Sequence, residues 1–181
     1  MELNRIIEEC KNNDRRAQKA LFYHYAGMSM SVARRYVGAA AVAQDIVQES
    51  MIRVFDQLSK VEFRNEAEFG GWISKITSRE AIRWLKKQKR FVFQEEINAE
   101  MFEPTSPQTD QFEKEELLGM LMKLPEGYRA VFNLYVIEEY SHREIGQLLD
   151  ITPSASRSQL TRARAQIQKM MTQKKAYEKV S

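Results

Sequence analysis

The sequence predicts an all-α protein of two helical domains joined by a linker, and three observations carry this prediction. The first hundred residues contain no proline, so they can run as long helices. Apolar residues recur with the helical period of 3.6 along most of the chain. An acidic stretch, 94–116, contains two prolines and little periodicity. We therefore expect a helical domain at 1–93, a linker at 94–112 and a second helical domain at 113–175.

Capping residues and apolar periodicity predict four helices in the N-terminal domain. The third has no acidic residue at its start, so we expect that start to be late or frayed. The expected helices are 3–11, a second one that Asn13 or Asp14 caps and Gly38 ends, 42–58 and 69–90.

The third helix has two unlike faces. Val47, Met51, Val54, Phe55 and Leu58 form its apolar stripe. An isoleucine lies among carboxylates on the opposite side, as expected where a basic partner helix docks, whereas most charged helix faces are merely solvated. This opposite face consists of Asp45, Gln48, Glu49, Ile52 and Asp56.

One edge of the fourth helix has cations in line with a tryptophan. Such an edge can follow a phosphate backbone and stack a base, although Trp72 and Trp84 are more often core residues. The loop before it, 59–68, has an aromatic, a guanidinium and an amide that could hold an unstacked base. The cations are Lys75, Arg79, Arg83, Lys86 and Arg90, and the loop residues are Phe63, Arg64 and Asn65.

Residues 140–164 predict a helix-turn-helix motif. Ser141 and Glu144 form a capping box, and Thr152 can cap a second helix that begins at Pro153. The outward face of that helix has small residues along its middle and arginines at its flanks, which suits the major groove of DNA. The alternative is an ordinary surface helix with solvated charges.

Composition excludes several functional classes. Hydrophobic residues make up 43% of the chain, but no apolar run reaches the length of a membrane span, and the N-terminus has no signal-peptide core. Cys10 is the single cysteine, and the two histidines lie far apart in sequence. We therefore expect a cytoplasmic protein that is not an enzyme, has no metal site or cofactor and does not insert into membranes.

Two motifs carry a family resemblance. AQDIVQESMIRVF (43–55), F-x-x-W-I-x-x-I (69–76) and WLKKQKR resemble the second conserved region of bacterial RNA polymerase sigma factors. LPEGYRAVFNLYVIEEYSHREIGQLLDITPSASRSQLTRAR resembles their fourth region. The two regions joined directly by a linker resemble the extracytoplasmic-function (ECF) group of the sigma-70 family.

The resemblance implies a subunit that recruits core RNA polymerase to promoters and helps to melt them. Its implied partners are core polymerase, promoter DNA and, as for many members, an anti-sigma factor; without partners we expect a monomer. The implied polymerase-binding residues are Asp45, Gln48, Glu49, Ile52, Arg53 and Asp56. Those for the −10 element are Phe63, Arg64, Asn65, Trp72, Lys75, Arg79, Arg83 and Lys86. Those for the −35 element are Arg129, His142, Arg143, Ser154, Arg157, Ser158, Thr161 and Arg162.

Three departures and two alternatives accompany this interpretation, and one departure is the missing acidic cap before the third helix. Arg79 replaces the family's usual asparagine, which favours a phosphate contact over a base contact. Ser156 replaces a usual valine, and we expect the loss of apolar area to loosen the recognition helix. A dimeric helix-turn-helix regulator would instead predict palindromic sites, and a helical protein-binding adaptor would predict no promoter-dependent binding.

Overall fold

The computed structural model describes residues 3–88 and 114–178, and every regular element within them is helical. The chain divides into two compact units, Met1–Trp84 and Leu85–Ser181, so the boundary lies in the last turn of the fourth α-helix. The all-α prediction is confirmed over these residues. The linker expected at 94–112 and Arg90 lie outside them.

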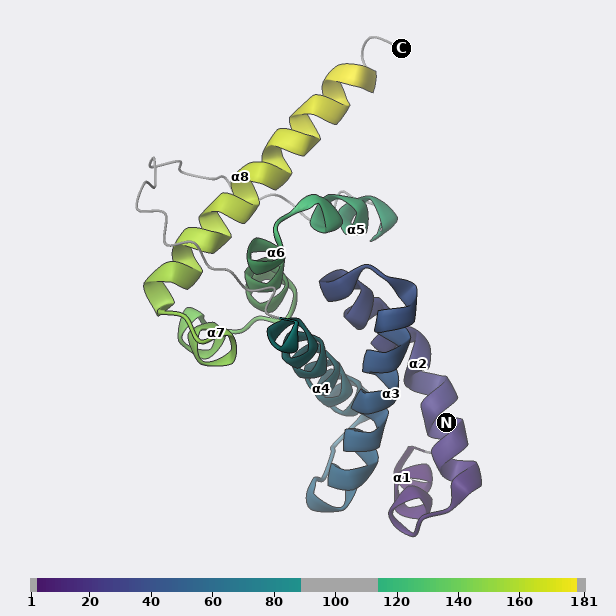
Figure 1. Ribbon diagram of the computed structural model, residues 1–181. Helices are drawn as coiled ribbons and strands as arrows, with labels where there is room; N and C mark the ends of the chain where they lie inside the picture. The colour runs from purple at the N-terminus through teal and green to yellow at the C-terminus, as the bar shows by residue number, and fades with distance from the viewer. Residues whose placement is uncertain (1–2, 89–113, 179–181) are drawn as a thin grey trace. The chain divides into compact units, whose positions relative to one another are not determined.

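Four α-helices make up the N-terminal unit (Figure 1). The side chain of Asp14 caps the second by accepting from the backbone N–H groups of Arg16 and Ala17. Gly38 ends it at a φ of 72°, a conformation that favours glycine. The elements are α1 (Leu3–Lys11), α2 (Arg15–Val37), α3 (Ala40–Gln57), the 3₁₀ turn η1 (Leu58–Lys60) and α4 (Glu66–Lys87).

Two helix starts differ from the sequence prediction. α3 begins at Ala40, two residues earlier than expected, although Ala39 has no side-chain cap. Alanine has the highest helix propensity, so Ala40 and Ala41 in the first turn compensate for the missing cap. α4 begins at Glu66, because Asn65 Oδ1 accepts a hydrogen bond from the backbone N–H of Glu68 at 2.8 Å.

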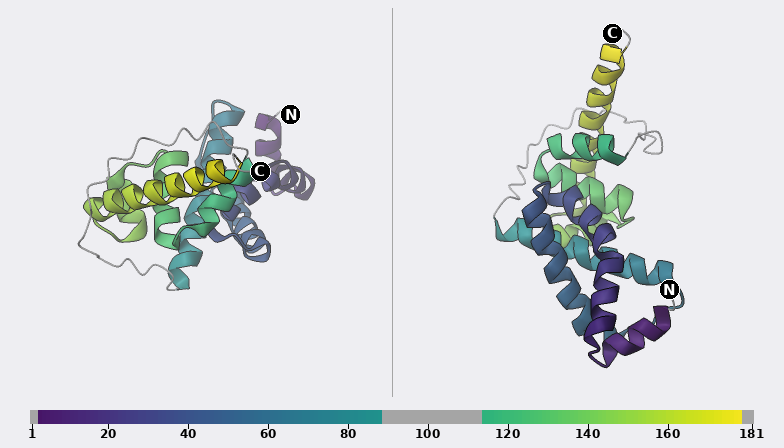
Figure 2. Two further views of the ribbon diagram at one scale, coloured as in Figure 1. Left: turned by 90° about the horizontal axis from the view of Figure 1, so that it is seen from above. Right: turned by 90° about the vertical axis from the view of Figure 1, so that its right-hand side faces the viewer.

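The C-terminal unit is built along one long helix. α5, α6 and α7 contact α8, whose last turns project beyond them (Figures 1 and 2). α8 continues to residue 178. The elements are α5 (Lys114–Lys123), α6 (Glu126–Phe132), its π-helical continuation η3 (Asn133–Ile137), α7 (His142–Leu149) and α8 (Pro153–Glu178).

Each unit has its own apolar core, which holds the exposed faces of its helices in place. The stripe predicted for α3 packs inward at Val47, Met51, Val54 and Leu58, while Phe55 is half-buried. Fully buried side chains of the first unit include Leu21, Tyr36, Met51, Phe69 and Ile73. Those of the second include Leu121, Phe132, Leu134, Ile145 and Ile167.

Candidate nucleic-acid and partner interfaces

The expected acidic face of α3 is exposed. Ile52 has 53% of its surface exposed, and the only other exposed large hydrophobic residue among those described is Tyr23. The exposed Asp45, Gln48, Glu49 and Asp56 share this side of the helix. An apolar centre with an acidic rim can desolvate against a partner while the rim selects a basic surface.

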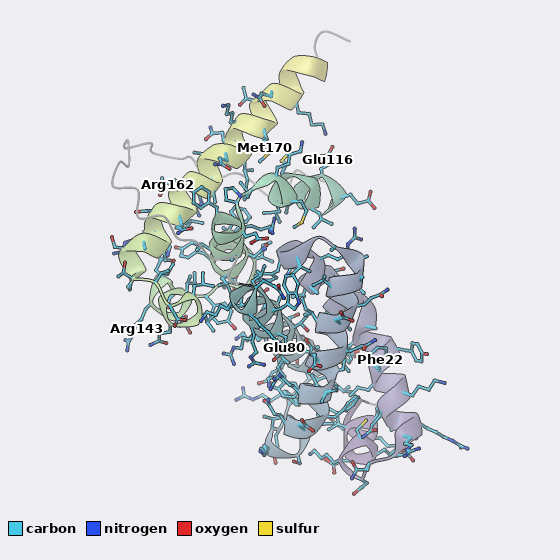
Figure 3. The ribbon with its side chains drawn as sticks, in the orientation of Figure 1. Phe22, Glu80, Glu116, Arg143, Arg162 and Met170 are labelled. Carbon is cyan, nitrogen blue, oxygen red and sulfur yellow. The ribbon has the colours of Figure 1, made fainter. Side chains whose placement is uncertain are left out.

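Arg53 and Arg83 meet at a carboxylate that sequence reasoning did not single out. Glu80 of α4 is only 7% exposed, and it forms ion pairs with Arg53 of α3 and with Arg83 Nη1, the latter at 2.5 Å. A buried carboxylate requires such partners, because desolvation without them is costly. The i,i+3 spacing of Glu80 and Arg83 was the only sequence signal for this cluster. Figure 3 labels Glu80 on α4.

The aromatic residues at the start of α4 form one cluster. The Phe63 ring lies 4.8 Å from Phe69 and 5.0 Å from Trp72, and the Tyr25 ring lies 5.2 Å from Phe69, between centroids. Phe69 is fully buried, whereas Phe63 and Trp72 are half-buried. The cluster therefore fixes Phe63, and its partly exposed rings can serve as a stacking platform.

Of the polar residues beside this cluster, one caps α4 and most of the others are exposed. Asn65 uses its side-chain oxygen to cap α4, which leaves that atom engaged within the protein. The backbone N–H of Arg64 donates to the Glu68 carboxylate at 2.9 Å, and the Arg64 side chain is exposed. Lys75, Arg79 and Arg83 are exposed along one edge of α4, and Lys86 is half-buried.

The helix-turn-helix motif has the expected caps. Ser141 Oγ accepts from the backbone N–H of Glu144, and the Glu144 carboxylate accepts from the Ser141 N–H at 2.8 Å. Thr152 Oγ1 accepts from the Ala155 N–H at 3.0 Å. The turn passes close to α7, since a Cβ on Gly146 would lie 2.6 Å from the Ile151 carbonyl oxygen. Glycine at this position permits the sharp turn.

α8 has a buried apolar side and an exposed polar side, as the sequence predicts. Leu160, Ala163 and Ile167 are buried on the inner side, and Met171 is half-buried. The outer side has exposed and half-exposed polar residues that can approach base edges. These are Ser154, Arg157, Ser158, Thr161 and Arg162. Figure 3 labels Arg162 on α8 and the exposed Arg143 on α7, the two helices of the motif.

Arg129, which the resemblance implied for the −35 element, is buried in the C-terminal unit. It is 6% exposed, and its Nη1 donates to the carbonyl oxygens of Met122 and Leu124, each at 3.4 Å. These carbonyls are at the C-terminal end of α5, where a cation is favourable. The geometry therefore assigns Arg129 to the α5–α6 turn and argues against a DNA contact.

His142 is part of a small polar cluster between η3, α7 and α8. Its ring stacks on Tyr135 at 4.4 Å, and its Nδ1 lies 2.9 Å from Ser156 Oγ. Burial, followed by the charges of Arg157 and Arg164, lowers the pKa of His142 below its ordinary value. Neutral pH therefore favours the uncharged imidazole. Ser156 is fully buried, and its hydrogen-bond contact with His142 joins α7 to α8 where the sequence predicted only a loss of apolar area.

Two further observations concern chemistry and membranes. Cys10 is buried, and this burial raises the pKa of its thiol to about 11, which keeps it protonated. Within 3–88 and 114–178, no group of three or more His, Cys, Asp or Glu side chains could hold a metal ion. The same part of the chain has no helix with the length and apolarity needed to cross a bilayer.

Comparison with known proteins finds matches on both sides of the linker. Residues 21–91 match the family Sigma-70 region 2, and residues 114–167 match Sigma-70, region 4. The chain is 25% identical over 176 residues to the ECF RNA polymerase sigma-E factor of Haemophilus influenzae, covering 90% of this chain and 92% of that protein. It is 26% identical over 144 residues to the RNA polymerase sigma factor YlaC of Bacillus subtilis, covering 76% and 82%.

A solved structure described as CnrH in complex with the cytosolic domain of CnrY is 20% identical. The match has a TM-score of 0.47 and covers 92% of this chain and 95% of that one.

Proposed function

Because the chain belongs to the sigma-70 family of bacterial RNA polymerase sigma factors, in the ECF group, we propose a division of labour among its exposed faces. As a sigma factor it directs core RNA polymerase to promoters for the initiation of transcription. We assign polymerase binding to α3, the −10 element to the start and cationic edge of α4, and the −35 element to α7 and α8.

The acidic face of α3 suits a basic helical surface of core polymerase. Ile52 supplies an exposed apolar anchor, and Asp45, Gln48, Glu49 and Asp56 supply the polar rim. A rim charge mainly sets the rate and selectivity of association, whereas a central apolar residue supplies more of the affinity. Arg53 lies at the border of this face and pairs with Glu80.

The Phe63–Trp72 cluster and the edge of α4 suit an opened −10 element. Half-buried rings that their neighbours hold in place can stack an unpaired base without a large loss of conformational freedom. Arg64, Lys75 and Arg79 provide exposed cations for the phosphates of the same strand. Stacking and phosphate contacts together would favour the melted state of the promoter.

The outer side of α8 suits the major groove at the −35 element. Arg157 and Arg162 can reach base edges or phosphates, and the small Ser154, Ser158 and Thr161 allow close approach. Arg143, exposed in the first turn of α7, is placed for a backbone contact. We do not include Arg129 in this set, and we assign His142 a positioning role within the motif.

The observation that carries the proposal is the presence, in one chain, of an acid-ringed apolar face and a capped helix-turn-helix with an arginine-edged outer face. A non-catalytic role follows from this assignment, because the polymerase would supply the chemistry. We also propose that the protein acts in the cytoplasm, where it would meet the polymerase.

In vitro transcription on a library of random promoters tests the proposed function. Core polymerase with the protein should give transcripts from sites that share two sequence elements at a fixed spacing. Core polymerase alone should not select them. Binding to palindromic sites by a dimer, without polymerase, would instead support the regulator that the sequence left as an alternative.

A further inference from the structure

Glu80 connects two surfaces that the proposed function assigns to different partners. Its carboxylate pairs with Arg53, next in sequence to Ile52 at the centre of the polymerase-binding face. It also pairs with Arg83, which follows Arg79 by one helical turn on the DNA-binding edge. The Glu80 side chain is 7% exposed, whereas the Arg53 and Arg83 side chains are 40% and 56% exposed.

The pairing with Arg53 affects the acidic face of α3. Helical spacing puts Arg53 one turn from Glu49 and from Asp56, so an unpaired guanidinium there could neutralise part of the acidic rim. It would also repel a basic partner. By pairing with Arg53 from α4, Glu80 supplies an alternative to these contacts and helps to keep the face acidic.

The pairing with Arg83 affects the cationic edge of α4. Arg79 and Arg83 are four residues apart on the same helix edge, and both are exposed. The Glu80 carboxylate lies 2.5 Å from Arg83 Nη1, so a DNA phosphate would have to compete with it for the guanidinium. A buried carboxylate is a strong competitor because losing a partner leaves its charge poorly solvated.

We propose that Glu80 is a positioning residue that keeps Arg53 out of the polymerase-binding face and Arg83 away from promoter phosphates. This inference rests on the proposed function, because it assumes that α3 meets polymerase and that the edge of α4 meets DNA. Glu80 thereby strengthens polymerase binding while it limits the number of phosphate contacts.

The Glu80→Gln variant tests this role, because it preserves side-chain shape and removes the charge. Release of Arg53 should weaken binding to core polymerase by roughly two- to fivefold, the scale of one exposed charge interaction. Release of Arg83 should add one phosphate contact. With saturating core polymerase, the slope of log affinity against log salt should then steepen by about 0.9 for duplex DNA or about 0.7 for a single strand.

Weaker polymerase binding together with an added DNA contact distinguishes positioning from simple loss of structure, which would weaken binding to both polymerase and DNA. The salt dependence is measured on a promoter fragment recovered by the transcription selection. Arg83→Gln in the Glu80→Gln background should restore the wild-type slope, and Arg53→Gln in that background should recover most of the polymerase affinity. Glu9→Gln on α1 changes net charge equally at an exposed site and should leave both quantities unchanged.

Weakening of both interactions in a folded Glu80→Gln protein, or no change in either, overturns the inference. If that variant does not fold, Arg83→Gln alone decides: the inference expects an unchanged salt slope, and a flatter slope contradicts it. Failure of the wild-type protein to select any promoter would refute the proposed function instead, and this result is obtained before any variant is made.

Discussion

Replacing Ser156 with alanine tests the hydrogen bond that joins the two helices of the motif. The Ser156 hydroxyl is fully buried in α8, and its Oγ lies 2.9 Å from Nδ1 of His142 at the start of α7. Alanine removes this oxygen and adds no volume, so the change is confined to one hydrogen bond and a small void.

The geometry gives the expected loss of stability in Ser156→Ala. A neutral intramolecular hydrogen bond contributes a net ~1 kcal/mol, and the half-buried His142 can recover part of its hydration in the variant. Alanine raises helix propensity by about 0.5 kcal/mol relative to serine, which partly offsets the loss. Ser158→Ala, at a half-exposed position of the same helix, should show only the gain in helix propensity. The local stability of the two variants should therefore differ by about 1 kcal/mol, roughly fivefold in the equilibrium constant for local unfolding.

Native-state amide hydrogen exchange of the full-length protein is the suitable assay, because two units need not unfold in one step. Amides of α7 and of the first turns of α8 should exchange roughly fivefold faster in Ser156→Ala than in Ser158→Ala. Equal exchange in the two variants would show that the hydrogen bond does not hold the motif together.

Three further predictions concern charge. The pKa of His142 is lower in the folded protein than its ordinary value of 6.5, so the unfolded chain binds more protons just below that pH. Protection of the α7 and α8 amides against hydrogen exchange should therefore fall as the pH decreases below about 6.5. His142→Gln should flatten this pH dependence, and an unchanged pH profile in that variant would refute the role of His142. Arg162→Ala should cost about 1 to 3 kcal/mol in binding to a −35 element and relax specificity at one position, whereas an equal loss on all sequences would indicate a phosphate contact. Lys75→Gln with Arg79→Gln should flatten the salt slope of promoter binding by about 1.4 on the opened strand, or by about 1.8 on duplex DNA, and an unchanged slope would assign this edge to solvated surface.

Local signals in the sequence predicted much of the fold. The cap at Asp14, the terminator Gly38 and the capping box of Ser141 and Glu144 lie within a few residues of the groups they satisfy, so the chain order reveals them. Helical periodicity likewise separated the buried and exposed sides of α3 and α8. The start of α3 was misplaced because the prediction relied on a cap and neglected the helix propensity of Ala40 and Ala41.

Long-range pairings could not be read from the sequence. Arg53 and Glu80 are 27 positions apart, and Ser156 and His142 are on different helices. The partners of Arg53 and Ser156 come within reach only after the helices pack. The resemblance, rather than a pattern in the residues, had assigned Arg129 to DNA, and nothing in the sequence indicated the partner of Ser156.

Reversing two charges on α3 tests the central claim most directly. Asp45→Lys with Glu49→Lys replaces two exposed acids of the polymerase-binding face with cations, and like charges across an interface cost several kcal/mol. Reversal of Glu8 and Glu9, two exposed acids on α1, is the matched control. Binding of each folded, full-length variant to core polymerase is measured by pull-down and titration. The account predicts that the α3 variant loses polymerase binding while the α1 variant retains it. Retained binding by the α3 variant would contradict the assignment of this face.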